Sequence, residues 1–139
     1  MSATIIRTKL LIKLGEMQSL KAAYDWETSN PSGNYPFAAL TLRDGEGSFE
    51  STAHNLRRRG FRIRIYQERA KIGQGPETAE DISANVIDEL EKALDMDTTL
   101  SGTCKYVIPT GWTAGYVDRE LDTRILEINV DAFELVSSA

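Results

Sequence analysis

The sequence predicts an α+β fold: an antiparallel or mixed sheet of about four to five strands, covered by two helices. Three observations predict it. Two segments carry apolar residues at helical spacing, one segment alternates apolar and charged residues, and the strand-like segments are joined by hairpin-length connections. The expected order is helix, three strands, helix, two strands. With 139 residues, the chain is expected to form a single domain, residues 1–139, which buries roughly 68% of its unfolded surface.

The first helix is expected from Ala3 to Leu20. One face of it collects residues at steps of three and four: Ile6, Leu10, Leu14, Met17 and Leu20. Three further residues, Ile5, Leu11 and Ile12, widen the apolar surface beyond one stripe. Either a wide core face or cover by a partner subunit explains that width, and the usual width of apolar stripes favours the core face.

Two strands are expected next, at Lys21–Glu27 and Phe37–Leu42. The segment between them, Thr28–Pro36, is rich in turn-forming residues, so the pair is predicted to form a hairpin with a long tip. Arg43–Asn55 has two glycines and no clear period, which predicts a mobile loop with room for one short helical turn.

The central strand is expected within Leu56–Glu68, which contains five arginines in eight residues. Phe61, Ile63 and Ile65 alternate with Arg62, Arg64 and Tyr66. Successive side chains of a strand point to opposite faces, so this strand has one apolar face and one cationic face.

The second helix is expected from Glu77 to Asp97, because its apolar residues keep helical spacing: Ala79, Ile82, Val86, Ile87, Leu90, Ala93 and Leu94. Thr78 and Asp81 approximate a capping box at its start. Asp88, Glu89 and Glu91 lie off the apolar stripe, with the spacing of a solvated face. The segment has eight acidic residues against one lysine.

The last two strands complete the sheet. Thr103–Tyr116 is expected to be a strand that ends in a turn-rich loop, because Pro109, Gly111 and Gly115 interrupt it. Leu121–Val136 alternates as a strand, but Phe133 and Leu135 fall on the opposite parity. A β-bulge near Ala132 is predicted to restore one apolar face.

The composition argues against several functions. The longest apolar cluster is far shorter than the roughly 20 residues that cross a bilayer, and the N-terminus lacks a secretory signal. One cysteine, Cys104, and one histidine, His54, are too few for a zinc site or a catalytic triad. We therefore expect no enzymatic activity, no metal and no cofactor.

Charge is segregated along the chain. The net charge of −5 opposes general adhesion to nucleic acid, yet six of the sixteen Lys and Arg residues fall within Leu56–Arg69. A solvated strand defended by charge, a docking surface for an acidic partner, and a nucleic-acid surface all stay open. The last is weakened because only Tyr66 is available on that face to stack on bases.

A cationic strand and an anionic helix in one chain suit a head-to-tail contact between identical subunits, and such a contact closes into a ring when the rotation between subunits permits it. The interface candidates on this basis are Arg57, Arg59, Arg62, Arg64, Asp88, Glu89 and Glu91. Arg62 and Arg64 either pair with neighbouring acids or line the channel. Pairing is favoured, because a strongly cationic channel would bind passing DNA and slow it.

Nearly the whole chain resembles, in the order and length of its segments, the tail terminator (tail completion) proteins of long-tailed bacteriophages and their relatives at the head-to-tail joint. The matching segments are TIIRTKLLIKLGEMQSL, AAYDWE, YPFAALTL, FRIRIYQE, ETAEDISANVIDELEKAL, TCKYVIPTGW and TRILEINVDAFEL.

The resemblance implies a homohexameric ring that docks on the finished tail tube, stops its polymerisation and presents a surface to the head connector, while DNA passes through its lumen. It implies a location in the virion after assembly in the host cytoplasm, and no membrane partner. Under it, the loops at Thr28–Pro36, Arg43–Asn55 and Pro109–Asp118 would reach the tube, the connector or the next subunit. Trp112, in one of them, is the candidate anchor, or else it folds back over the sheet edge.

Two other functions remain open from the sequence. One is a head-closure or connector protein of the same joint. The other is a small α+β nucleic-acid-binding domain that uses the arginine strand.

Overall fold

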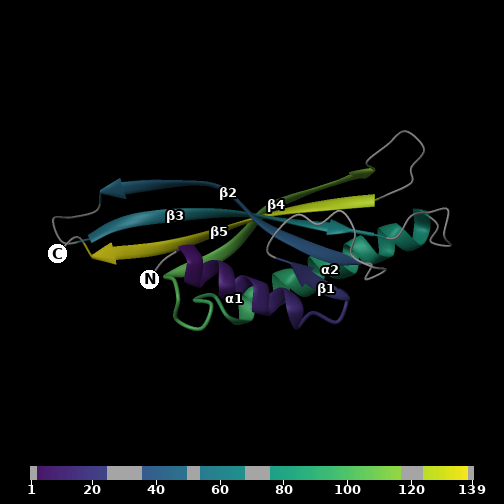
Figure 1. Ribbon diagram of the computed structural model, residues 1–139, viewed down its shortest axis with the longest axis horizontal. Coiled ribbons are helices and arrows are strands. Elements are labelled where there is room, and N and C mark those ends of the chain that lie inside the picture. The colour runs from purple at the N-terminus through teal and green to yellow at the C-terminus, as the bar shows by residue number, and fades with distance from the viewer. Residues whose placement is uncertain (1–2, 25–35, 50–53, 68–75, 117–123, 138–139) are drawn as a thin grey trace.

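Two helices lie on one side of a five-stranded sheet in the computed structural model (Figure 1). The model describes residues 3–24, 36–49, 54–67, 76–116 and 124–137. Its elements are α1 (Ala3–Gly15), β1 (Ala22–Tyr24), β2 (Phe37–Phe49), β3 (His54–Tyr66), α2 (Pro76–Met96), β4 (Tyr106–Tyr116) and β5 (Arg124–Ser137). The α+β class and the order helix, three strands, helix, two strands are confirmed.

The sheet is mixed, with the strand order β1-β2-β3-β5-β4. β1 runs parallel to β2, so the predicted hairpin between these strands is wrong. All other neighbours are antiparallel. The segment between Tyr24 and Phe37 is about as long as a connection between parallel strands requires. The hairpin was predicted from turn-forming residues, and their presence does not distinguish a parallel from an antiparallel pair. The tip of the expected hairpin, residues 28–35, lies outside the described residues.

The core lies between the helices and the sheet, as the two periodicities predicted. α1 packs on β1 and β2, while α2 packs on β4 and β5. Four elements contribute large side chains that are no more than 3% exposed: Ile6, Leu10 and Leu14 from α1, Val86, Leu90 and Leu94 from α2, Phe61, Ile63 and Ile65 from β3, and Leu126, Ile128 and Val130 from β5. Burying each such side chain stabilises the fold by about 1.5–3 kcal/mol.

α1 differs from its prediction in two respects. It ends at Gly15, and turns carry the chain on to Leu20, although Met17 and Leu20 are buried as expected. Ile5 and Ile12 are 42% and 48% exposed, so the wide core face is wrong for these two residues. Leu11 is partly buried against the core.

Two segments predicted as loops are strands. Residues 43–49 continue β2, and β3 begins at His54, so most of the expected loop at 43–55 is a β-ladder that pairs Gly45 with Arg59 and Gly47 with Arg57. β4 likewise continues through Pro109, Gly111 and Gly115 to Tyr116. Both segments lie along an edge of the sheet, because β4 is an outermost strand and β1 covers only residues 37–39 of β2. Glycine and proline are tolerated there because one side of the backbone needs no partner.

The predicted bulge in β5 is wrong. β5 stays in register with β3 from Ser137 to Ile125, and the bulges fall in the outer strands instead, at Arg43 in β2 and Thr110 in β4. Phe133 keeps its outward parity by stacking on Tyr106, with ring centroids 4.5 Å apart. Leu135 is left 43% exposed.

Glu89 joins the two helices. Its carboxylate accepts hydrogen bonds from the backbone N–H groups of Gln18 and Ser19, at 2.9 and 3.0 Å, and from the Ser19 hydroxyl. Burial alone would raise the pKa of Glu89, but these three hydrogen bonds outweigh it and lower the pKa. Just after the C-terminal end of α2, Asp97 forms an ion pair with Lys13 of α1 at 3.0 Å.

Replacing Glu89 by Gln is expected to lower the free energy of unfolding at pH 7 by about 1–2 kcal/mol, because hydrogen bonds to a charged acceptor are lost. A lowered folded-state pKa contributes stability above the ordinary value of 4.5, and that contribution is lost as the pH falls through the folded-state pKa. Urea unfolding from pH 3 to pH 7 should therefore show the difference between wild type and Glu89→Gln shrinking in acid. Glu91→Gln, on the exposed side of the same helix, is the matched control and should match wild type at every pH.

Candidate functional site

Arg62 and Arg64 lie on the face of the sheet that points away from the helices. They flank Glu127 of β5, to which both arginine Nε atoms approach within 3.3 Å. Arg64 donates a hydrogen bond to this carboxylate, whereas Arg62 makes an ion contact without hydrogen-bond geometry. The two arginines thus share one acid of their own chain.

A second charged cluster lies further along the same face, at the bulge of β2. Arg43 contacts Asp44 at 2.8 Å and also contacts Asp131, while Arg58 reaches the same two carboxylates at 3.1 and 3.3 Å. Hydrogen bonds from Arg58 and then Arg43 lower the pKa of Asp44. Gly60 lies beneath this cluster, and a Cβ there would come within 2.1 Å of the Asp44 carboxylate.

The charges on this face balance. Across the strands that the structure describes, it carries four arginines and four acids: Arg43, Arg58, Arg62, Arg64, Asp44, Glu46, Glu127 and Asp131. The pairs that involve the exposed Asp44 and Glu46 add little stability, typically about 0–1 kcal/mol each, whereas Asp131 is buried between its two arginines. The acids instead neutralise the continuous positively charged surface that the arginine-rich sequence suggested.

The other two candidate arginines point to the helix side of the sheet. Arg59 lies 3.5 Å from Glu134, whose side chain is almost fully buried. Arg57 lies against Gly47 of β2, where a Cβ would come within 2.2 Å of its guanidinium. The structure therefore divides the arginine strand between two faces and does not bring it together as one patch.

The acidic candidates on α2 also separate. Asp88 and Glu91 are exposed, as a solvated face predicts. Glu89 is partly buried and holds the turn that follows α1, so its expected place on that solvated face is wrong. The acidic helix and Arg62 and Arg64 lie on opposite sides of the sheet, so their pairing across a subunit contact stays a prediction.

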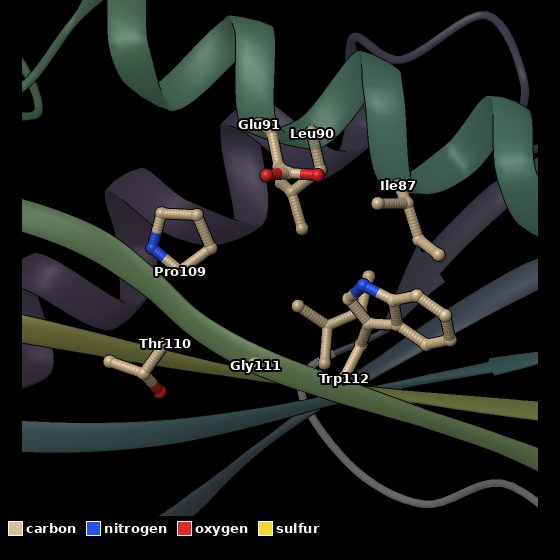
Figure 2. A pocket seen from close by; sticks show the side chains of 8 residues that line it. Ile87, Leu90, Glu91, Pro109, Thr110, Gly111 and Trp112 are labelled. Atoms are coloured by element: carbon tan, nitrogen blue, oxygen red, sulfur yellow. The ribbon is translucent and has the colours of Figure 1, made fainter.

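Trp112 lies in the outer strand β4, opposite Ile128, and its ring is turned toward α2 (Figure 2). Ile87 points from α2 toward the indole, and together with Leu90 and Glu91 they line a hollow of ≈ 200 Å³. A second hollow of ≈ 210 Å³ lies on the other side of Trp112, against Ser83, Ala84 and Asp88. The indole is still 55% exposed, so it lies over the sheet edge and also presents a large apolar surface.

Among the described residues, no cluster of three or more His, Cys, Asp or Glu residues could hold a metal ion. Burial raises the pKa of Cys104 to about 11, aided by Glu134 and Asp97, so its thiol stays protonated at neutral pH. His54 begins β3, but its side chain lies outside the described residues. No described helix is long and apolar enough to cross a membrane.

Sequence reasoning missed one feature of the site, the outer edge of β2. Leu42 is 62% exposed there, and the segment Asp44–Gly47 carries acids on one face and glycines on the other. The period-two alternation D-G-E-G was the available signal for a strand. The two glycines conceal this signal, because glycine is more typical of loops than of strands.

Comparisons with known proteins give one informative result. No family model matches the chain, and no curated protein matches it. Among solved structures, a chain in the structure described as the virion of a native gene transfer agent particle matches with a TM-score of 0.58. The two chains are 12% identical, and the match covers 98% of this chain and all of the other. This protein therefore has the fold of a chain found in that virion.

Charge balance on the sheet face away from the helices predicts weak binding to duplex DNA. Glu127→Gln should raise the affinity, because Arg62 and Arg64 lose the acid they share. The slope of log K against log salt should become more negative by about 0.9 for each additional phosphate that the protein neutralises. Fluorescence anisotropy with a short labelled duplex at several salt concentrations measures both the affinity and the slope.

The control for this experiment is Glu91→Gln, which makes the same change in net charge on α2. An equal increase in affinity for the two variants would show that only net charge matters, and would contradict a specific balance at Glu127.

Proposed function

We propose that this protein is a structural subunit of a phage-like virion, and specifically a tail terminator. In this role it forms a ring, a homohexamer by the family pattern, that caps the tail tube, ends its polymerisation and joins the tail to the head connector. The observation that carries the proposal is the correspondence of fold along nearly the full length of both chains with a chain of a gene transfer agent virion. The order and length of the sequence segments add the tail-terminator role.

The balanced face supports this role over nucleic-acid binding. A ring at the head-to-tail joint must let DNA pass through its lumen, and a lumen lined by equal numbers of arginines and acids holds DNA weakly. The shared contact of Arg62 and Arg64 with Glu127 supplies such a lining. A dedicated nucleic-acid-binding domain would instead need uncompensated positive charge.

The proposal predicts a ring in solution or on contact with the tail tube. Light scattering on a size-exclusion column should give a mass of about six times the 15.5 kDa of one chain, and negative-stain images of that peak should show rings. Added to polymerising tail tube protein of the same particle, the ring should shorten the tubes and appear at one end of each.

Two outcomes would redirect this assignment. Rings that bind the head connector but leave tube length unchanged would indicate a head-closure protein. A chain that stays monomeric both alone and with tube protein, and leaves tube length unchanged, would contradict the tail-terminator role.

A further inference from the structure

Among the described residues, the sheet has two outer edges along which no further strand lies. β1 pairs only with residues 37–39 of β2, so in the part of the chain that the structure describes, β2 has no strand on its outer side from Leu40 onward. β4 is the outer strand at the other side of the sheet. Unpaired strand edges are templates for pairing with another chain.

Only part of the β4 edge is available. In its first half, the Val107 N–H already donates to the carbonyl of Thr98 at 2.7 Å, and Pro109 has no N–H to donate. The bulge at Thr110 follows. The available edge of β4 therefore begins at Gly111 and ends with the strand at Tyr116.

The two available edges lie at opposite ends of the sheet. Gly111 to Gly115 lie level with β2 residues 37–41, which is mostly the part of β2 that β1 covers. The uncovered part of β2 lies further along, next to residues 55–63 of β3. Two copies can thus join these edges only if they are offset along the strand direction.

We propose that the edge of β4 from Gly111 to Tyr116 pairs in antiparallel fashion with the edge of β2 from Leu40 to Glu46 in a second copy of this chain, offset by four residues. This inference rests on the proposed ring. β2 and β4 run in opposite directions within one subunit, so copies related by rotation about an axis along the sheet meet in antiparallel orientation.

The offset of four follows from three constraints. First, it must be even, because a shift by one residue would turn the helices of neighbouring subunits to opposite faces. Second, the offset must give a plausible strand tilt. Four residues correspond to a shift of about 13 Å along the strands, while the four strands β2, β3, β5 and β4 of one subunit span about 19 Å across the sheet. That corresponds to a strand tilt of about 35°, within the range of closed barrels.

The third constraint is the length of the free edge. At an offset of four, Tyr116 lies opposite Leu40 of the neighbour, immediately next to Ala39, where that neighbour's own β1 begins to cover β2. The incoming strand and β1 would then lie end to end along β2. An offset of two would make the two strands collide, and an offset of six would leave a gap.

At the same offset, a large side chain of β4 lies opposite a glycine in β2 of the neighbour. Trp112 lies opposite Gly45 of the neighbour, on the helix side of both strands. A hollow of ≈ 310 Å³ lies beside Gly45, lined in part by Ala3, Leu42 and Arg59. Trp112 would cover the exposed Leu42 and lie beside the Arg59 guanidinium, which attracts an aromatic face. The two large exposed apolar residues of these edges are thereby buried together.

The hand of the fold sets which face lines the ring. β3 and β4 are parallel and are connected through α2, and such connections are right-handed. This hand determines the direction in which the offset tilts the strands around the ring. That direction agrees with the right-handed twist of β-strands only if the helices lie on the outside of the ring. Arg62, Arg64 and Glu127 then face the lumen, where their balanced charges would hold passing DNA only weakly.

Disulfide cross-linking tests the register. In a Cys104→Ala background, Gly111→Cys and Glu46→Cys place two thiols opposite each other on the lumen face; a Cβ at Gly111 has open space around it, and Glu46 is exposed. The two edges of one sheet are three strand spacings apart, about 14 Å, too far for a bond within one chain. Mild oxidation should therefore give a ladder of covalent multimers on a non-reducing gel.

Glu46→Cys combined with Ala114→Cys is the matched control, because residue 114 points to the other face and should give no ladder. A ladder from Glu46→Cys with Thr113→Cys in place of Gly111→Cys would overturn the offset of four. If the parent protein forms rings and neither pair cross-links, the edge pairing is wrong while the ring stands. A protein that stays monomeric both alone and with tube protein, and gives no ladder in either case, contradicts both.

Trp112→Ala provides an independent readout. It should weaken subunit association at least about tenfold, measured by light scattering over a dilution series, with an unchanged circular dichroism spectrum. Association equal to that of wild type would overturn the seating of Trp112 beside Gly45.

Discussion

The pairing of β3 with β5 is the constraint on which the rest of the structure depends. It runs along the whole of β3 without a register shift, and it places Phe61, Ile63 and Ile65 against the helices. A slip by one residue would turn these side chains outward and bring Arg62 and Arg64 into the core. The same register brings Glu127 between those two arginines, so one alignment determines both the packing of the core and the charge of the opposite face.

The irregularities of the sheet lie in β2 and β4, on either side of the regular central pair. The bulges at Arg43 and Thr110 lie at nearly the same level of the sheet, one on each side of the Phe61–Val130 pair. Bulges bend a strand and increase its twist. In Figure 1 the strands cross one another in projection near the middle of the sheet, as a strongly twisted sheet does. The bulge in β2 also brings Arg43 and Asp44 over Gly60, where the second charged cluster forms.

The sequence predicted what depends on regular periodicity. The apolar stripe of α2 and the alternation of residues 61–66 were sufficient, because both elements bury one complete face. The segments 43–49 and 109–116 were mistaken for loops, since their glycines and proline weaken the strand signal, and outer strands tolerate these residues. The parity of Phe133 led to the prediction of a bulge in β5. Phe133 in fact faces outward and stacks on Tyr106, a contact that the sequence does not reveal because the two residues are distant along the chain. Trp112 could be named from the sequence as a candidate anchor, and the structure shows that it is largely exposed. The hollow beside Gly45 could not be foreseen without knowing that residues 44–47 are a strand.

The central claim is that neighbouring subunits continue one sheet around a ring, with the helices outside and the arginine–glutamate face inside. An electron cryo-microscopy reconstruction of the assembled ring tests it most directly. We expect β4 of each subunit to be hydrogen-bonded to β2 of the next, with Trp112 beside the neighbour's Gly45 and Arg62, Arg64 and Glu127 on the lumen wall. A ring in which the helices line the channel, or in which the outer edge of β4 contacts only solvent, would contradict the account.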